Sequence, residues 1–258
     1  MEAAFFDVDK TVIAKASMMA FAPSFYREGL IGRRSLARGM WTQLLYVRFG
    51  AGPERLSRIR ESVLSLIAGW EQARVRQIVT ETLVAVIAPI TYADAVGLID
   101  EHRAAGRRVY VVSASPAEVI EPLARHLGAD GALASRARVD ASGRYTGEME
   151  RYAYGPQKAA LVREVAAREG IDLSRSWAYS DSATDLPMLE AVGHPVCVNP
   201  DRALRGIAEE RGWEVRRFRA PAGPATPGPV KALLVPAVLA LATTAWWWQR
   251  RPGRPRLS

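Results

Sequence analysis

AAFFDVDKTVIAK, from Ala3 to Lys15, places two aspartates directly behind a run of small and aromatic apolar residues. The apolar run predicts a short buried strand from Ala3 to Val8. In open parallel sheets, ligands bind at the carboxyl ends of the strands, so Asp7 and Asp9 are candidates for a functional site.

Strand-like and helix-like segments alternate along the second half of the chain. Strands are predicted at RVYVVS (108–113), SWAYS (176–180) and PVCVN (195–199), with a hairpin over 132–150. Helices are predicted at 93–105, 156–168 and 182–193, and at a segment with Ser115 as N-cap and Pro116 in the first helical position. This order predicts an α/β fold with a mainly parallel sheet covered on both faces.

About a hundred residues separate the first two strands, and most of them have a helical pattern. Apolar residues recur at three- and four-residue spacing in LSRIRESVLSLIAGW (56–70) and ARVRQIVTETLVAVIA (73–88). The sequence therefore predicts a helical subdomain inserted after the first strand.

Polar clusters follow three of the predicted strands: DVDKT, SAS and SDSATD. Because the carboxyl ends of parallel strands lie at one edge of a sheet, we expect their side chains to meet there. Lys158, at the start of a helix, is well placed to join them. Four carboxylates so close together repel one another strongly without a cation. The expected cluster is Asp7, Asp9, Ser113, Asp181 and Asp185.

These residues stand in the order and at the spacing of the four motifs of the haloacid dehalogenase superfamily of phosphohydrolases, which the chain resembles over roughly residues 3–211. The resemblance is to the phosphoserine-phosphatase-like branch, subfamily IB, which has a helical cap between its first two motifs. It implies a Rossmann-like catalytic core over residues 1–14 and 89–218 and a helical cap over residues 15–88.

The resemblance also implies a phosphatase that uses Mg²⁺. Asp7 would attack phosphorus to form an aspartyl-phosphate, and Asp9 would protonate the leaving oxygen and then activate the hydrolytic water. A phosphate ester dianion resists an anionic nucleophile unless cations offset its charge. The resemblance assigns the metal to Asp7, the backbone carbonyl of Asp9 and Asp181, all of them the hard oxygen ligands that Mg²⁺ prefers.

Four further residues complete the implied site. The Ser113 hydroxyl would donate to a phosphoryl oxygen, Lys158 would supply a compact positive charge, and the Thr11 hydroxyl would support the phosphoryl group. Asp185, four residues after Asp181, orients Lys158 or a metal-bound water.

The sequence departs from the family at several positions. Lys10 and Ser180-Asp181-Ser182 stand where many relatives have Gly and Gly-Asp-Gly. Phosphoserine phosphatases also carry a cap glutamate that binds the substrate ammonium, whereas the corresponding stretch here, around Ala16, has no acid. Arg58 or Arg60 matches the cap arginine that holds a substrate carboxylate, although both lie in a basic helix where a solvated face is an equal alternative.

The C-terminal part has a different composition. Residues 219–229 are rich in Pro, Gly and Ala and predict a linker. ALLVPAVLALATTAWWW, residues 232–248, carries no charge and ends in three tryptophans, followed by a basic tail at 250–258. This pattern predicts a helix at 230–249 that spans the membrane, lies in its interface or, less in keeping with the tryptophans and arginines, docks on the protein.

Composition narrows the function further. The net charge of +8 is not accompanied by a nucleic-acid-binding motif, and the single cysteine and the absence of a secretory pattern predict a cytoplasmic catalytic domain. We expect a Mg²⁺-dependent phosphomonoesterase at the cytoplasmic membrane, acting on a small or lipid-linked phosphate ester. The alternatives are a phosphoserine phosphatase-like enzyme acting on a soluble metabolite and a catalytically silent, membrane-tethered binding module. The sequence identifies no protein partner.

Overall fold

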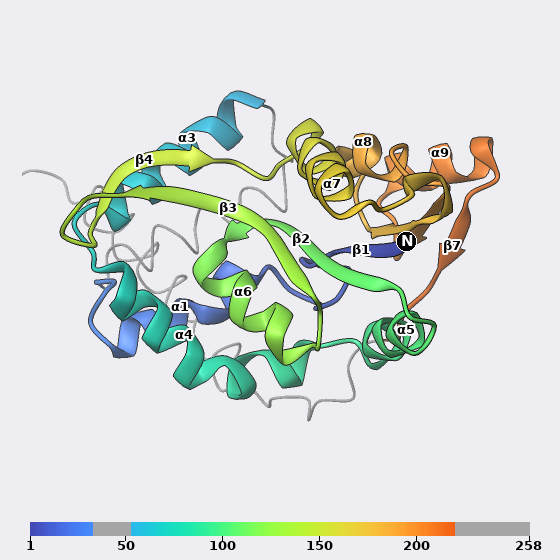
Figure 1. The fold of residues 1–258 in the computed structure, drawn as a ribbon. Helices are drawn as coiled ribbons and strands as arrows, with labels where there is room; N and C mark the ends of the chain where they lie inside the picture. The colour runs from blue at the N-terminus through green and yellow to red at the C-terminus, as the bar shows by residue number, and fades with distance from the viewer. Residues whose placement is uncertain (33–52, 220–258) are drawn as a thin grey trace, which may run out of the picture. The chain divides into compact units, whose positions relative to one another are not determined.

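The structure is a computed structural model that describes residues 1–32 and 53–219 (Figure 1). The described residues all belong to one compact unit, which extends to residue 222. Residues 33–52 of the predicted cap lie outside the described residues, as do the predicted linker beyond Arg219, the predicted helix at 230–249 and the tail at 250–258. Among the helices that are described, none has the length and apolar character needed to cross a membrane.

The described part of the chain forms a seven-stranded sheet in the order β4-β3-β2-β1-β5-β6-β7. Its strands are β1 (Ala3–Asp7), β2 (Arg108–Pro116), β3 (Gly131–Val139), β4 (Tyr145–Arg151), β5 (Trp177–Ser180), β6 (His194–Val198) and β7 (Glu214–Arg216). β4 pairs antiparallel with β3, and the other neighbours pair in parallel. The predicted α/β fold with a mainly parallel sheet is confirmed.

The central position of β1 explains its apolar sequence. A strand covered on both faces has a continuous apolar run, and all of β1 is buried. Successive side chains point to opposite faces. Phe5 stacks on Tyr110 with 5.4 Å between ring centroids on one face, and Phe6 stacks on Tyr179 at 4.3 Å on the other.

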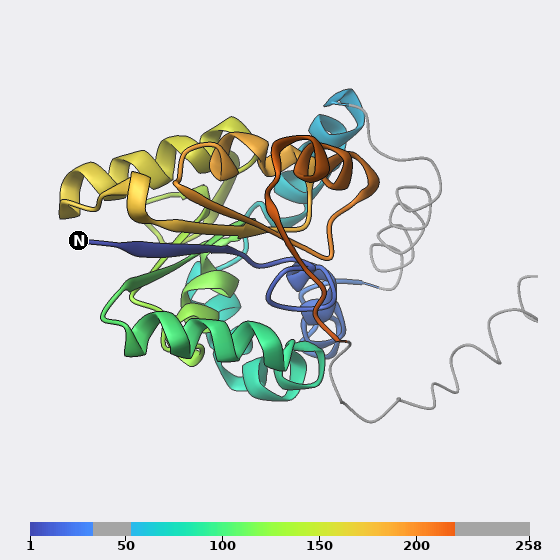
Figure 2. The same ribbon diagram turned by 90° about the vertical axis from the view of Figure 1, so that its right-hand side faces the viewer.

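Helices cover both faces of the sheet. α5 (Ala93–Ala104) and α6 (Ala117–His126) contribute to the apolar cluster on the Phe6 face. α7 (Pro156–Glu169), α8 (Leu186–Leu189) and α9 (Arg202–Arg211) contribute to the cluster on the Phe5 face. Figure 2 shows α5, in green, and α7, in yellow, on opposite sides of β1. The result is the three-layer arrangement of an open α/β sheet.

The insertion between β1 and β2 is helical where it is described. It contains α1 (Ser17–Arg27), α3 (Pro53–Ile67) and α4 (Gln72–Ile87), followed by a 3₁₀ turn at Ala88–Ile90. Phe21 and Phe25 of α1 and Ile78 and Val79 of α4 are buried, and they continue the cluster on the Phe6 face of the sheet. The cap helices therefore share one apolar core with the sheet.

Two local predictions are wrong. Ser115 does not cap a helix, because β2 continues its pairing with β3 as far as Pro116 and α6 begins only at Ala117. The helix predicted over 182–193 is a 3₁₀ turn at Ala183–Asp185 followed by the short α8. The Ser182 hydroxyl accepts from the Thr184 amide and stabilises the turn.

Candidate active site

The candidate residues lie where the central strands end. Asp7 is the last residue of β1 and pairs with Val112 of β2, so Ser113 follows at the same edge. β5 ends at Ser180, directly before Asp181. The sheet grows from β1 to β4 in one direction and from β5 to β7 in the other, so β1 and β5 flank the topological switch point. Open α/β sheets bind their ligands at this position.

Lys158, on the first turn of α7, joins two of the carboxylates. Its Nζ donates to Asp7 Oδ1 at 2.6 Å and to Asp185 Oδ2 at 2.7 Å, and its side chain is only 5% exposed. The Ser180 hydroxyl also donates to Asp185 Oδ2, at 2.8 Å. Burial lowers the pKa of Lys158, but the Asp7 and Asp185 carboxylates outweigh burial and raise it. Lys158 is therefore a fixed cation next to Asp7.

Asp7 is held through both of its oxygens. Thr11 Oγ1 donates to Oδ2 at 3.1 Å, while Oδ1 accepts from Lys158. Burial and the neighbouring aspartates raise the pKa of Asp7 to about 8, although Lys158 opposes this shift. The 2.6 Å contact with the ammonium is that of an ion pair, and we therefore assign Asp7 its charged form.

Acidic groups outnumber cations at this edge of the sheet. Burial raises the pKa of Asp181 to about 6, Lys10 opposes this shift, and Asp185 adds to it. A divalent cation would lower the pKa of such carboxyls, and their oxygens are the hard donors that Mg²⁺ prefers.

The described residues contain no group of three or more His, Cys, Asp or Glu side chains arranged to hold a metal. The predicted magnesium set is of another kind, because it takes two side chains, Asp7 and Asp181, and the backbone carbonyl of Asp9. Its chemistry and its location in an acidic, buried cluster fit Mg²⁺.

Asp9 has a separate set of partners. Its Oδ1 accepts from the Ser17 amide at 2.7 Å, and its Oδ2 accepts from the Ser115 hydroxyl at 3.1 Å. Both partners are neutral, whereas Asp7 has a cation.

The structure places the two cap arginines on α3. The Arg60 guanidinium lies 5.2 Å from the ring centroid of Tyr152, and its Nη2 donates to Ser57 Oγ at 3.2 Å. Arg58 is exposed on the same helix. A substrate-binding role for either arginine stays a prediction.

Three serines near the site were not predicted to contribute to it. Ser180 directly precedes Asp181, at a position where the family resemblance implies Gly, and its hydroxyl donates to Asp185. Ser115 belongs to the SAS cluster, but its sequence context suggested an N-cap. Ser17 has no sequence signal, because only the fold brings it to Asp9.

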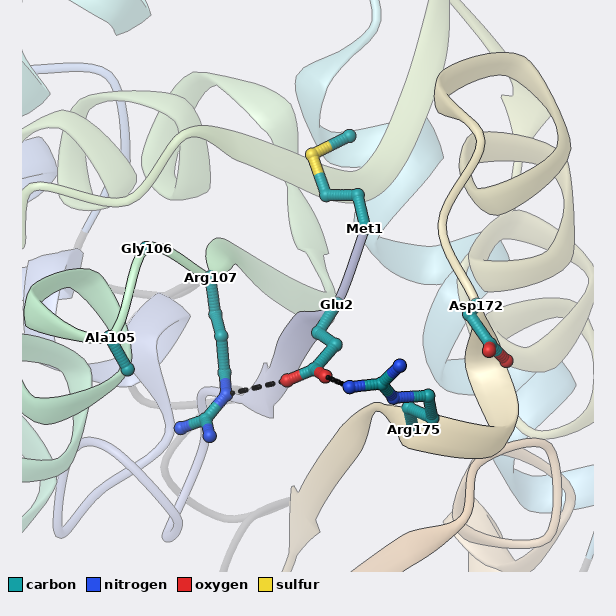
Figure 3. Close-up of a pocket in the computed structure, with 7 residues that line it drawn as sticks. All are labelled: Met1, Glu2, Ala105, Gly106, Arg107, Asp172 and Arg175. Atoms are coloured by element: carbon teal, nitrogen blue, oxygen red, sulfur yellow. Dashed lines mark hydrogen bonds and ion pairs between the residues drawn. The ribbon is translucent and has the colours of Figure 1, made fainter.

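A hollow at the opposite edge of the sheet is a different feature. Figure 3 shows Arg107 and Arg175 pointing from either side toward Glu2. Glu2 accepts from Arg107 Nε at 3.0 Å and pairs with Arg175 Nη2 at 2.5 Å. β1 separates Glu2 from Asp7, so this hollow lies at the wrong end of the strand to belong to the candidate site.

The fold and the site define a class of protein: a doubly wound α/β fold with a buried aspartate–lysine pair at its switch point. The family model of the haloacid dehalogenase-like hydrolases matches residues 4–190, and the chain belongs to this family.

Similar proteins narrow the activity. The chain is 48% identical over 259 residues to an "inhibition of morphological differentiation protein" of Streptomyces azureus, covering 96% of this chain and 94% of that protein. It is 47% identical over 243 residues to a probable phosphatase of Mycobacterium tuberculosis, covering 94% and 83%. A phosphoserine phosphatase of the same organism is 36% identical over 221 residues, covering 84% and 71%.

A solved structure has a similar fold and a related sequence. A protein of unknown function from Bordetella pertussis Tohama I matches with a TM-score of 0.72 at 32% identity, covering 83% of this chain and 97% of that one. Family and relatives together identify the chain as a phosphatase of the haloacid dehalogenase family, related to the phosphoserine phosphatases.

Proposed function

We propose that this phosphatase is a Mg²⁺-dependent phosphomonoesterase that works through an aspartyl-phosphate on Asp7. The observation that carries the proposal is the buried ion pair of Asp7 with Lys158 at the switch point of the sheet. Lys158 holds the carboxylate charged and offsets the charge of an approaching phosphoryl group. Bound Mg²⁺ would neutralise further charge on the phosphoryl oxygens and on Asp7 and Asp181.

The reaction divides into two transfers. Asp7 attacks phosphorus, the bond from phosphorus to the ester oxygen breaks, and Asp9 gives its proton to the leaving oxygen. Asp9 then takes a proton from water as the water oxygen attacks phosphorus, which releases inorganic phosphate and restores Asp7. Thr11 and Ser113 supply hydroxyls to the site, and Asp185 keeps Lys158 in place.

The test uses activity on an aryl phosphate and the trapped intermediate. Asp7→Asn should lower kcat by roughly 10³-fold or more and abolish the phosphorylated protein seen after a rapid quench, because an amide is a poor nucleophile. Chelation of divalent metal should stop turnover, and added Mg²⁺ should restore it. Asp100→Asn, the same change on the exposed face of α5, is the control. Near wild-type turnover of Asp7→Asn would show that another group is the nucleophile.

For the substrate, we propose a small or lipid-linked phosphate ester other than phosphoserine. The supporting observation is that the stretch around Ala16 has no acid to pair with a substrate ammonium. The related phosphoserine phosphatase of M. tuberculosis favours the alternative of a soluble amino-acid phosphate. A kcat/KM for phosphoserine about a hundredfold above that of other esters would select the alternative. A silent binding module is not favoured, because every catalytic position is filled.

We further propose that the catalytic unit is cytoplasmic and attached to the membrane through residues 230–249. The support is in the sequence alone: an uncharged stretch, three tryptophans and a basic tail. The attachment would give the enzyme access to a lipid-linked ester.

A further inference from the structure

The Asp9 carboxylate belongs to a partly buried hydrogen-bond network that contains no part of the Asp7–Lys158 pair. The Ser17 hydroxyl donates to Ser115 Oγ at 2.7 Å, and the Ser115 hydroxyl donates to Asp9 Oδ2 at 3.1 Å. The Ser17 amide donates to Asp9 Oδ1 at 2.7 Å. Ser17 is completely buried and Ser115 is 7% exposed. Asp9 is thus held from two directions, and the two serines are joined to each other.

The network connects the cap to the core. Ser17 is the first residue of α1, the first helix of the cap, and Ser115 lies near the end of β2. The N-cap residue of α1 is Ala16, which has no side chain able to bond the free amides of the first turn. Asp9, from the loop after β1, supplies the missing acceptor. The hydrogen bond that holds the start of α1 on the core is therefore also one that orients Asp9.

The same serine also contacts the predicted phosphate-binding residue. The Ser115 amide donates to Ser113 Oγ at 3.1 Å. A hydroxyl oxygen that accepts a bond keeps its own proton free to donate. Ser115 thus orders the Ser113 hydroxyl through its backbone and Asp9 through its side chain, so that only the second effect is removed when the Ser115 hydroxyl is deleted.

We propose that Ser115 and Ser17 are positioning residues for Asp9, with Ser17 acting through the Ser115 hydroxyl. Together they fix the direction of the Asp9 carboxylate. Because Ser17 belongs to α1, proton transfer to the leaving group depends on the position of α1. This inference rests on the proposed acid/base role of Asp9.

The leaving group provides a readout that a structural role would not change. An alkoxide is a poor leaving group and needs a proton as the ester bond breaks, whereas a nitrophenolate leaves readily without one. A misdirected Asp9 should therefore slow phosphoryl transfer from an alkyl phosphate more than from an aryl phosphate. The ratio kcat/KM reports the steps up to the first irreversible one and leaves out the later hydrolysis of the phosphoenzyme.

The experiment measures kcat/KM of the full chain on glycerol phosphate and p-nitrophenyl phosphate. Ser115→Ala should lose about tenfold or more on the alkyl ester and less than about threefold on the aryl ester, as expected for one hydrogen bond to a charged group. Ser17→Ala, which keeps its amide, should lose less. The double variant should equal Ser115→Ala alone. Ser24 is another buried serine of α1, so Ser24→Ala is the matched control and should leave kcat/KM on both esters unchanged.

Several results would overturn the inference. Equal losses on both esters would assign Ser115 a structural role, and no loss would assign it none. Losses that multiply in the double variant would show that Ser17 does not act through Ser115. Asp9→Asn separates the two levels of argument: if it keeps full activity on both esters, the proposed acid/base is wrong. If it is inactive on the alkyl ester while Ser115→Ala is unimpaired, only the positioning role fails.

Discussion

Lys10 has a left-handed backbone conformation in the loop that carries both aspartates, with φ of 68°. Its amide donates to the Ile13 carbonyl at 2.7 Å, which closes the turn. A left-handed conformation destabilises a residue with a Cβ by about 1–2 kcal/mol, and glycine avoids this cost. The Gly that the family resemblance implies at this position thus has a conformational reason.

Substitution of Lys10 tests this reasoning. Lys10→Gly should raise the free energy of unfolding by about 1 kcal/mol over Lys10→Ala, measured by urea denaturation, because the two variants lose the same charge and differ in backbone freedom. The neighbouring Val8 and Thr11 do not have a positive φ, so a change to glycine there would bring no such gain. A Lys10→Ala protein as stable as Lys10→Gly would mean that the turn is not strained.

At the scale of single residues, the sequence predicts side chains that strand ends bring together and misses those that tertiary packing adds. Asp7, Asp181 and Lys158 follow from the motif order, and the structure places Lys158 between Asp7 and Asp185. Ser17 reaches Asp9 only because α1 folds back on the loop after β1, and no local pattern encodes that contact.

His102 joins α5 to β5 in the core. Its Nε2 lies 2.8 Å from the Tyr179 hydroxyl, and Arg107 lies 3.4 Å from Nδ1. Burial, Arg107 and Arg216 lower the pKa of His102 to about 4 from its ordinary 6.5. The folded state therefore binds this proton more weakly than the unfolded state does. The associated stability is complete above about pH 6.5 and is lost as the pH falls toward 4.

This element gives a pH prediction. Between pH 7 and pH 5 the free energy of unfolding of the wild-type protein should fall by about 2 kcal/mol more than that of His102→Gln, which cannot titrate. Urea denaturation of both proteins at both pH values gives the difference, and titration of the active-site carboxyls cancels in it. Parallel pH profiles would indicate that His102 is protonated in the fold without a penalty.

Among the elements, those with strong local signals were predicted well. The hairpin of β3 and β4 lies where the sequence predicts it, over residues 132–150. The predicted boundary between β2 and α6 was wrong. Proline is compatible with the first turn of a helix and with the last residue of a strand, and the pairing of Pro116 with Ser135 places it in β2.

For the whole molecule, the residues proposed to be catalytic all lie within the first compact unit, residues 1–222. A chain ending at Ala222 should therefore keep its kcat/KM on a soluble aryl phosphate. If the proposed substrate is lipid-linked, the same chain should lose most of its rate on an ester embedded in anionic vesicles, because it lacks the uncharged stretch and the basic tail. An equal loss on both substrates would show that the tail stabilises the fold.

Fold class was predictable for the whole molecule because alternating strands and helices have few stable arrangements. The sharing of one apolar core by cap and sheet was not, since it depends on how Phe21 and Phe25 meet Ile78 and Val79. The periodicity of each helix shows that it has an apolar face but does not show which other face covers it.

The central position of β1 has a consequence for biosynthesis. Ala3 pairs with Arg108 of β2 and Ala4 with Trp177 of β5. The first strand to be translated therefore cannot pair with β5 until about residue 177 has been made. At roughly 5–20 residues per second, the apolar run AAFF stays unpaired on that side for about 10–35 s during translation. Throughout that interval the nascent chain carries an unpaired apolar segment of the kind that chaperones bind, and Asp7, the proposed nucleophile, has no lysine partner until residue 158 has been translated.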